Sequence, residues 1–260
     1  MAYETILTER RGDVQVITIN RPERLNAAPP LTFDEIRAAL ADLAGARAVL
    51  LTSTGRAFCS GADLAGGSLT RADPPQATFE ALSNSYNPTL TAIAELPVPI
   101  VAAVRGPAAG IGASLALACD LVVASDTAYF LEAFANIGLV PDGGASWMLA
   151  RLAGKARALE MALLGERVPA AKALEWGLIH RVVADDALDA DAFALAERLA
   201  AGPTRALGLA RRAINAALDS DYATALAREA NDQREAMRGP DAAEGARSFL
   251  EKRKPSFSGQ

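Results

Sequence analysis

Hydrophobic and polar residues follow two different spacings along the chain. Residues 14–19 (VQVITI) alternate with a period of two, which is typical of a half-buried strand. Residues 48–52, 99–104 and 121–124 are short apolar runs, as expected for strands buried on both faces. Residues 108–119, rich in alanine and leucine, predict a helix between two of them. This alternation predicts an α/β core with a largely parallel sheet.

A helix start is predicted near residue 32. Thr32 can act as N-cap, and Glu35 follows it at the spacing of a capping box. Phe33, Ile36 and Leu40 then recur at helical spacing. We therefore expect an amphipathic helix that begins at Thr32.

Beyond residue 143 the pattern is almost wholly helical. One short apolar strand is expected at 178–183. The predicted helices cover 144–153, 155–164, 170–176, 187–201, 204–218, 221–238 and 240–252. We expect an α/β core over 1–195 and a helical region over 196–260 that packs on the core and on a neighbouring subunit. Residues 66–77 (GGSLTRADPPQA) are predicted to form a mobile loop.

Charge and composition exclude several classes of partner. The 26 basic and 31 acidic residues give a net charge of -5, which argues against nucleic acid and anionic membranes as ligands. The apolar region 98–124 is interrupted by polar residues, so no membrane span is expected. Charges near the N-terminus disfavour a signal peptide, and Cys59 and Cys119 form no paired motif. We expect a cytoplasmic protein without a metal. The one histidine, His180, excludes any metal site built on two or more histidines.

Common catalytic motifs are absent from the chain. There is no G-x-S-x-G elbow, and Gly154-Lys155 lacks the rest of a P-loop. The glycines of 106–112 do not have the G-x-G-x-x-G spacing of a dinucleotide site. Three glycine-containing turns remain, at 57–64, 106–112 and 137–144.

The first two turns each follow a predicted strand. Gly61 and Gly110 can simply provide backbone freedom in a tight turn. Alternatively, small residues let a ligand approach, and the free N–H groups of a helix start can bind an anionic oxygen. Either turn taken alone leaves both interpretations open.

The third turn carries Asp142. This residue can be the N-cap of a helix that starts near Gly143. It can also be a proton shuttle, because apolar neighbours would raise its pKa while helix N–H groups would lower it. A cap and a catalyst are compatible, since the same geometry would aim the side chain.

These turns, in this order, resemble the crotonase (enoyl-CoA hydratase/isomerase) superfamily. The resemblance begins at 19–27 (INRPERLNA), close to that family's N-R-P-x-K/R-x-N-A opening, and essentially covers the chain. It continues through 58–64 (FCSGADL), 107–112 (PAAGIG), 164–166 (LGE), 171–178 (AKALEWGL) and 249–257 (FLEKRKPSF). Residues 28–30 (APP) depart from the family's usual leucine-asparagine pair.

The resemblance implies a crotonase-like spiral of β-β-α repeats whose C-terminal helices form trimers or dimers of trimers. It also implies an acyl-coenzyme A substrate and no separate cofactor. The thioester oxygen would be held by the backbone N–H groups of Ala62 and Ile111, an oxyanion hole. The residues implied to contact the substrate or its CoA are Arg24, Leu25, Ala27, Ser60, Gly61, Asp63, Leu64, Gly110, Phe134, Pro141, Phe249 and Lys252.

The chain departs from the hydratases of this family at the acid and base. Where they carry two glutamates, this sequence has Ser114 and Phe134, with Glu132 two residues from the second position. Because hydration needs one group to activate water and another to manage the α-proton, efficient hydration is not expected. On a strand the offset of two residues would keep Glu132 on the same face, so a contribution from it stays open.

Asp142 matches a carboxylate of branches that are not hydratases, and its surroundings resemble most the isomerases of bacterial phenylacetate breakdown. We expect an isomerase that moves a double bond or rearranges a ring through Asp142. The alternatives are a 2-enoyl-CoA hydratase and a non-catalytic acyl-CoA-binding subunit.

Two rival branches of the family use the same position differently. A dehalogenase-like branch would use Asp142 as nucleophile together with an active-site histidine, whereas His180 is expected to be packed or on the surface. A naphthoyl-CoA synthase branch would need further polar partners.

Overall fold

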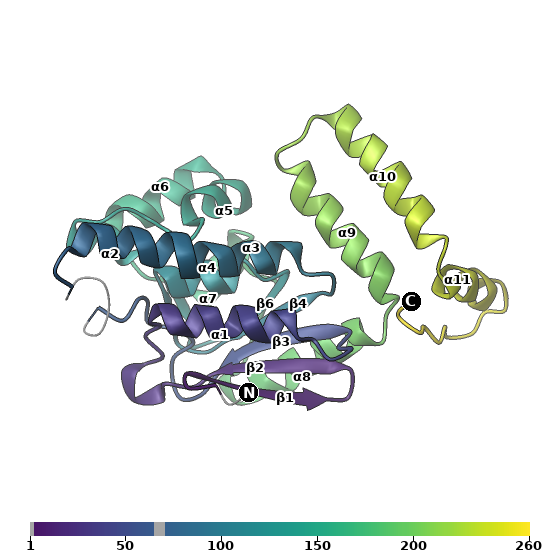
Figure 1. Ribbon diagram of the computed structural model, residues 1–260, viewed down its shortest axis with the longest axis horizontal. Helices are drawn as coiled ribbons and strands as arrows, with labels where there is room; N and C mark the ends of the chain where they lie inside the picture. The colour runs from purple at the N-terminus through teal and green to yellow at the C-terminus, as the bar shows by residue number, and fades with distance from the viewer. Residues whose placement is uncertain (1–2, 65–70) are drawn as a thin grey trace.

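A six-stranded sheet forms the centre of the protein, shown in Figure 1 by a computed structural model that describes residues 3–64 and 71–260. Its strand order is β1-β2-β3-β4-β6-β9. The first pair is antiparallel and the other neighbours are parallel. The strands are β1 (Ile6–Arg11), β2 (Val14–Ile19), β3 (Ala48–Ser53), β4 (Ile100–Val104), β6 (Leu121–Ser125) and β9 (Arg181–Val183).

Three short strands form a second sheet beside the first. β5 (Pro107–Ala109) and β7 (Tyr129–Leu131) pair in parallel, and β8 (Val168–Pro169) is antiparallel to β7. Isolated bridges from Cys59 to Ala108 and from Ala28 to Ala62 extend this layer. The chain therefore passes from β3, β4 and β6 in turn into the second layer, which is the predicted spiral of β-β-α repeats.

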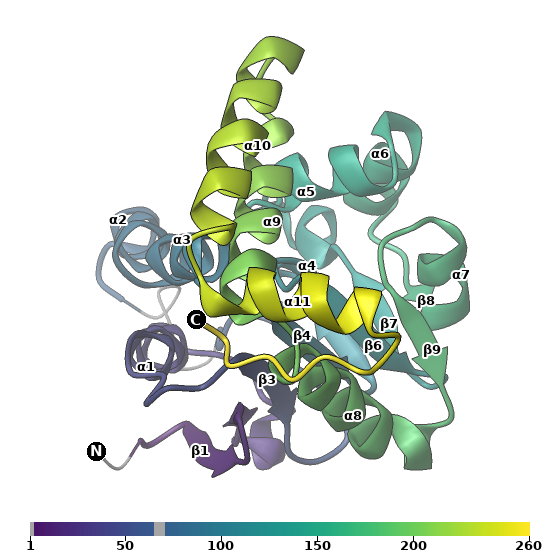
Figure 2. The same ribbon diagram turned by 90° about the vertical axis from the view of Figure 1, so that its right-hand side faces the viewer.

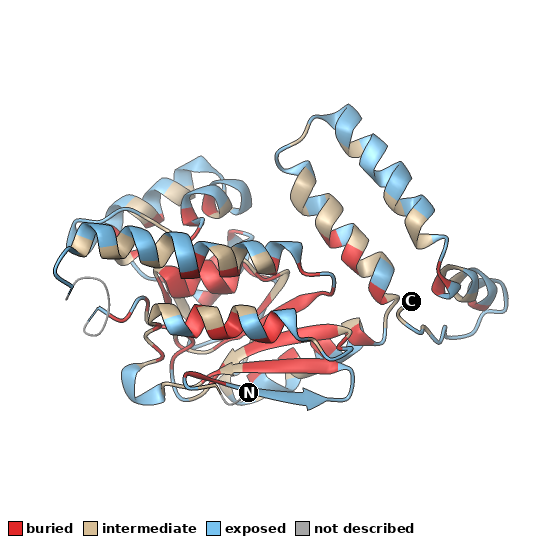
Figure 3. Cartoon of the chain, in the orientation of Figure 1, coloured by how far each residue is buried: buried red, intermediate tan, exposed pale blue. Residues whose placement is uncertain are grey.

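The main sheet is covered on both faces, which explains its apolar strands. On one face, Val14 and Val16 pack with helix α8 (Leu188–Ala200). On the other, Ile17 and Ile19 belong to a larger core that includes the helices α1 (Pro30–Ala41), α3 (Asn87–Glu95) and α4 (Ile111–Leu117). Figure 3 shows the buried residues concentrated in this region.

The C-terminal helices extend away from this body. Helices α9 (Thr204–Ala217) and α10 (Tyr222–Ala236) lie side by side, and α11 (Pro240–Leu250) crosses near their base (Figures 1 and 2). α9 is anchored by the guanidinium of Arg211, which pairs with Asp120 at 2.9 Å and donates to the carbonyls of Ile93, Ala94 and Leu96. α10 has no buried residue, so this part of the fold presents a large surface.

Eight further elements complete the fold of the described residues. They are the 3-10 helices η1 (Pro22–Arg24), η4 (Ala133–Ile137) and η5 (Asp185–Ala187), the π-helix η3 (Leu82–Tyr86), and the helices α2 (Pro74–Ala81), α5 (Ala145–Leu152), α6 (Lys155–Leu164) and α7 (Ala170–Glu175). Across the described residues, every helix is too short or too polar to cross a membrane. The division of the chain near residue 195 stays a prediction.

The predicted start of the first helix was wrong. α1 begins at Pro30 after Pro29, so Thr32 lies inside the helix, with its hydroxyl buried and without a hydrogen-bond partner in the part of the chain that the structure describes. Glu35 forms no capping box, because its carboxylate accepts hydrogen bonds from the backbone of Glu4 and Thr5 and from the Thr5 hydroxyl. A proline at the first helical position, where no N–H is needed, decided the start.

Three other predicted segments differ from the structure. Residues 108–119 contain the end of β5 followed by the shorter helix α4, and 178–183 holds only the three-residue strand β9. Within 66–77, residues 66–70 lie outside the described residues, and α2 begins at Pro74. Proline at the first helical positions again favours the start of a helix where a loop was predicted.

Candidate active site

A largely apolar cavity of about 250 Å³ lies where the three glycine-containing turns meet. The turns contribute Ser60, Gly61, Ala62, Asp63, Leu64, Gly110, Ile111 and Asp142, and Phe134 comes from η4 just before the third turn. The opposite wall comes from α1, α2 and η3, through Pro30, Thr78, Ala81, Leu82 and Tyr86. Nine of the residues proposed from the sequence are thus brought together from three separate segments.

The first turn is fixed by its backbone. The Gly61 carbonyl accepts from Ala28 N–H at 2.8 Å, and Asp63 N–H donates to the Ala28 carbonyl at 3.2 Å. Between these two bonds lies Ala62, whose N–H is not a donor in any hydrogen bond of the described residues. The residue that carries this N–H, unpaired among the described residues, lines the cavity.

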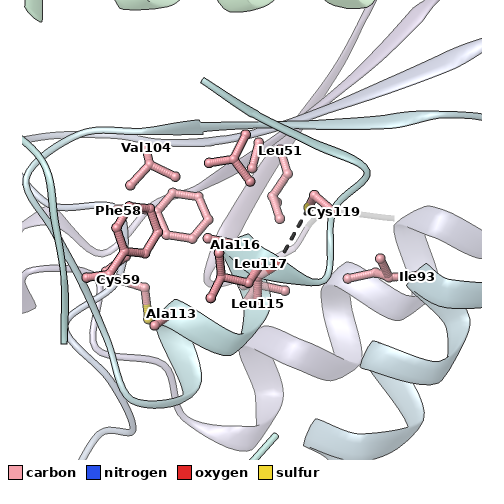
Figure 4. Packing of buried hydrophobic residues seen from close by; sticks show 14 of the residues in the cluster. Leu51, Phe58, Cys59, Ile93, Val104, Ala113, Leu115, Ala116, Leu117 and Cys119 are labelled. Atoms are coloured by element: carbon pink, nitrogen blue, oxygen red, sulfur yellow. Dashed lines mark hydrogen bonds between the residues drawn. The ribbon is translucent and has the colours of Figure 1, made fainter. Parts of the chain in front are cut away.

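The second turn packs directly on the first. Gly110 has a φ of 51°, a conformation that favours glycine, and it leads into α4. Because Ile111 is the first residue of α4, its N–H has no intrahelical acceptor. A Cβ placed at Gly112 would lie 2.5 Å from the Cys59 carbonyl oxygen, so the two turns touch backbone to backbone. Figure 4 shows Cys59 beside Ala113 of α4 within the buried core.

The third turn places Asp142 at the cavity. Its Oδ1 atom is buried and accepts no hydrogen bond from the described residues. Burial raises the pKa of this carboxyl to about 6. The backbone carbonyl of Asp142 accepts a hydrogen bond of 3.0 Å from the Ser114 hydroxyl on α4, which ties the third turn to the second.

The capping interpretation of Asp142 was wrong. α5 begins at Ala145 with Gly144 as its N-cap, and no side chain caps it. The expected lowering of the Asp142 pKa by helix N–H groups is therefore missing, and burial alone shifts it. Two glycines with positive φ, Gly143 and Gly144, separate the carboxylate from the helix start.

Glu132 and Phe134 do not lie on a strand, so their side chains do not share one face as a strand would require. Because β7 ends at Leu131, the argument that an offset of two keeps the same face does not apply to Glu132, the residue before η4. Its side chain is fully buried and does not line the cavity, whereas the Phe134 ring does. A Cβ at Gly110 would lie 3.4 Å from that ring, so Phe134 closes the wall beside the second turn.

A second aspartate at the cavity is engaged in ion pairs. Asp63 accepts from Arg21 at 2.9 Å and lies 3.7 Å from the guanidinium of Arg24. The Arg24 side chain remains about half exposed, at 49%. This pairing links the N-R-P turn to the first glycine-containing turn.

Other proposed contact residues lie outside the cavity lining. Leu25, Ala27 and Pro141 do not line it. Phe249, exposed at 83%, and Lys252 belong to the end of α11 and the turn after it. His180 is exposed and does not line the cavity either.

Tyr86 is a cavity residue that sequence reasoning missed. It ends the π-helix η3, is 6% exposed, and donates its hydroxyl to the Ala28 carbonyl at 2.9 Å. Its ring packs edge-on against Phe33, with centroids 4.7 Å apart. No motif marks this position, and a π-helix, which is often found at functional sites, becomes visible only in the structure.

The spiral fold, together with a cavity that joins two backbone turns to a buried carboxylate, defines a crotonase-type enzyme. The model of the Enoyl-CoA hydratase/isomerase family matches residues 9–260, and the chain belongs to this family. It is 42% identical to a 1,2-epoxyphenylacetyl-CoA isomerase of Escherichia coli, with 99% of each chain covered. It is 43% identical to a Rhodobacter capsulatus protein named "Probable enoyl-CoA hydratase", with 100% of each covered.

Solved structures give the same result for the fold. A crystal structure of an enoyl-CoA hydratase from Bacillus anthracis superimposes with a TM-score of 0.92 at 30% identity. The match covers 99% of this chain and 100% of the other. The predicted crotonase-like architecture is therefore confirmed.

Proposed function

We propose that the protein is an acyl-CoA isomerase in which Asp142 removes a proton from one carbon of the acyl group and returns it to another. The observation that carries this proposal is the environment of Asp142. It lines an apolar cavity, is buried at one oxygen, and has a pKa raised to about 6. A carboxylate with a pKa near the working pH is suited both to take up and to release a proton.

The two backbone turns fit the other half of this chemistry. Removal of the proton beside a thioester leaves an enolate, and its oxyanion would be held by the N–H groups of Ala62 and Ile111. One such donor contributes on the order of 3 kcal/mol to transition-state stabilisation in a well-studied protease. Because the donor is the backbone, the isoleucine side chain at position 111 does not remove it.

Several observations favour isomerisation over hydration. The Ser114 hydroxyl donates to the Asp142 carbonyl, and Phe134 has no titratable group, so neither replaces the paired glutamates of hydratases. The other cavity aspartate, Asp63, is paired with arginines. The similarity to the isomerase of Escherichia coli also supports isomerisation.

Hydration of a 2-enoyl-CoA is the second candidate function. The buried Glu132 carboxyl interacts electrostatically with Asp142, so a second acidic group lies near the first. Relatives named enoyl-CoA hydratase support this candidate. A non-catalytic acyl-CoA-binding subunit is the third.

The substrate would be a CoA thioester with an apolar acyl group, either a phenyl-derived ring or an alkyl chain, and no separate cofactor is required. A trimer or dimer of trimers in the cytoplasm is proposed as the working form. Exposed apolar side chains in the C-terminal helical region, such as Ile214, Met237 and Phe249, support such an assembly.

The test is mass spectrometry of 2-enoyl, 3-enoyl and phenylacetate-derived CoA thioesters incubated with the enzyme in heavy water. We expect deuterium uptake and a moved double bond without addition of water, lost in Asp142→Asn. Addition of water to the 2-enoyl thioester that persists in Asp142→Asn would overturn the mechanism. No change in any thioester would favour the binding-subunit alternative.

A further inference from the structure

One buried acid is left unused by the mechanism above. Glu132 has no exposed surface, and neither of its carboxyl oxygens has a hydrogen-bond partner among the described residues. An ionised carboxylate without any partner is strongly unfavourable in such a place. The same side chain as a neutral acid carries no such penalty for charge.

The Asp142 carboxylate is the charged group that acts on the Glu132 carboxyl and raises its pKa. The two carboxyls interact electrostatically, and the Oδ1 atom of Asp142 is likewise buried without a partner. Two carboxylates that interact in a low-dielectric region cannot both ionise easily, so their titrations are coupled. Burial and this interaction raise the pKa of Glu132 to about 8, above that of Asp142.

The charged groups on the elements packed against β7 and η4 do not neutralise the charge that an ionised Glu132 would carry. Those of α6, α7 and the segment before β8 are Lys155, Arg157, Glu160, Glu166, Arg167, Lys172 and Glu175, and only Arg157 among them is partly buried. Arg157 and Lys172 lie over the Trp176 ring, and Arg167 lies over the Tyr129 ring. Burial and Asp142 therefore account for the state of Glu132.

We propose that Glu132 is a positioning residue that stays protonated, so that Asp142 and the reacting acyl group together carry one unpaired negative charge throughout the reaction. In the free enzyme that charge is on Asp142. When Asp142 has taken the substrate proton, the charge is on the enolate oxygen, and the Glu132 proton has not moved. The inference rests on the proposed proton transfer by Asp142.

Ionisation of Glu132 would add a second negative charge near the developing enolate. Like charges in a low-dielectric site repel each other strongly, so enolate formation would become slower. The rate should therefore fall as the pH rises through about 8, on the alkaline side of the profile. Glutamine at this position copies the neutral acid and cannot ionise.

The first measurement is infrared titration of the whole protein with 13C-labelled glutamate, which needs no activity. We expect the C=O band of one protonated glutamic acid at neutral pH, lost as the pH rises through about 8 and missing in Glu132→Gln. In Asp142→Asn the band should disappear at a lower pH, because the repelling charge has gone. Glu175→Gln, which removes an exposed carboxylate, should keep the band unchanged.

The second measurement is the pH profile of kcat/KM for Glu132→Gln. We expect the alkaline decrease of the wild-type protein to be lost and the acid limb, which reports Asp142, to remain near pH 6. An alkaline limb that persists in Glu132→Gln, or a wild-type protein without a protonated glutamic acid at neutral pH, overturns the inference. If Asp142→Asn kept full activity, the proposed function would fail while the infrared result would still decide the state of Glu132.

Discussion

The cavity is built by two regions that differ in how they are held. Most residues of the first two turns are buried, although Ala62 and Leu64 are exposed, and all seven residues of α4, from Ile111 to Leu117, are buried. The segment that carries Asp142 is attached more loosely, since residues 135–140 are exposed. Within this segment Glu132, Phe134 and Gly143 are buried. The proposed backbone donors thus adjoin a close-packed frame around α4, and the carboxylate lies at the edge of this frame.

This difference has a chemical consequence. A backbone N–H acts in the same way whatever side chain it belongs to, so its position must be fixed by packing. A carboxylate changes its acidity with its surroundings, so its chemistry is set by burial and neighbouring charge. Changes in the first region should therefore affect folding and geometry, and changes in the second should affect proton transfer.

The largest expected effect is on folding, at Gly112. In Gly112→Ala the new Cβ would lie 2.5 Å from the Cys59 carbonyl oxygen and 2.7 Å from its Cβ, so the two turns must move apart. We expect a loss of about 1–3 kcal/mol in the free energy of unfolding, measured by urea denaturation. The matched control is Gly245→Ala in α11, whose new Cβ would meet Phe257 at 3.5 Å. Equal losses in both variants would contradict the idea of a close-packed frame.

The acid limb of activity is the next largest effect. Because the Asp142 pKa is raised to about 6, the carboxylate is the main form at pH 7 and the neutral acid is the main form at pH 5. We expect kcat/KM to fall by about tenfold between these two values, since only the ionised form accepts a proton. A carboxyl with an unshifted pKa would leave kcat/KM flat over this range, and a flat profile would show that burial does not tune Asp142.

A smaller effect is expected at the contact between the two regions. Ser114→Ala removes the hydrogen bond of 3.0 Å to the Asp142 carbonyl, a contribution of about 1 kcal/mol. We expect a several-fold lower kcat, because Asp142 is held less firmly. Ser248→Ala removes a similar bond to the Gly245 carbonyl, far from the cavity, and should lower stability without lowering kcat. Equal kcat in the two variants would show that the Ser114 hydrogen bond does not affect the catalytic rate.

The smallest effect is expected in the exposed part of the third segment. Val140 is 78% exposed, so Val140→Ser should change the free energy of unfolding by less than about 0.5 kcal/mol. The measurement is denaturant unfolding at two protein concentrations. A larger loss would show that another chain covers this surface in solution.

Much of the fold could be predicted from the sequence because the hydrophobic spacing is regular. The strands at 14–19, 48–52 and 121–124 were located to within a residue at each end, since apolar runs buried on both faces stand out. The short strands β5, β7 and β8 were not predicted. Each has two or three residues, too few for a period to be visible.

The candidate site was predicted in part. Motif residues of the three turns, including Gly61, Gly110 and Asp142, do line one cavity. Tyr86 was missed, because its place on the wall depends on how η3 packs against α1. The helix-capping role considered for Asp142 was wrong, because two glycines delay the start of α5.

The longer strands of the main sheet, the C-terminal helices, the family and the residues of the turns could be recognised from the sequence alone, because these depend on local spacing and on motifs. Which carboxyl groups are buried and which are paired became visible only in the folded chain. Asp63 meets two arginines, whereas Asp142 and Glu132 meet no cation among the described residues. The physical reason is that the acidity of a side chain depends on solvent exclusion and on charges brought near it from distant parts of the chain.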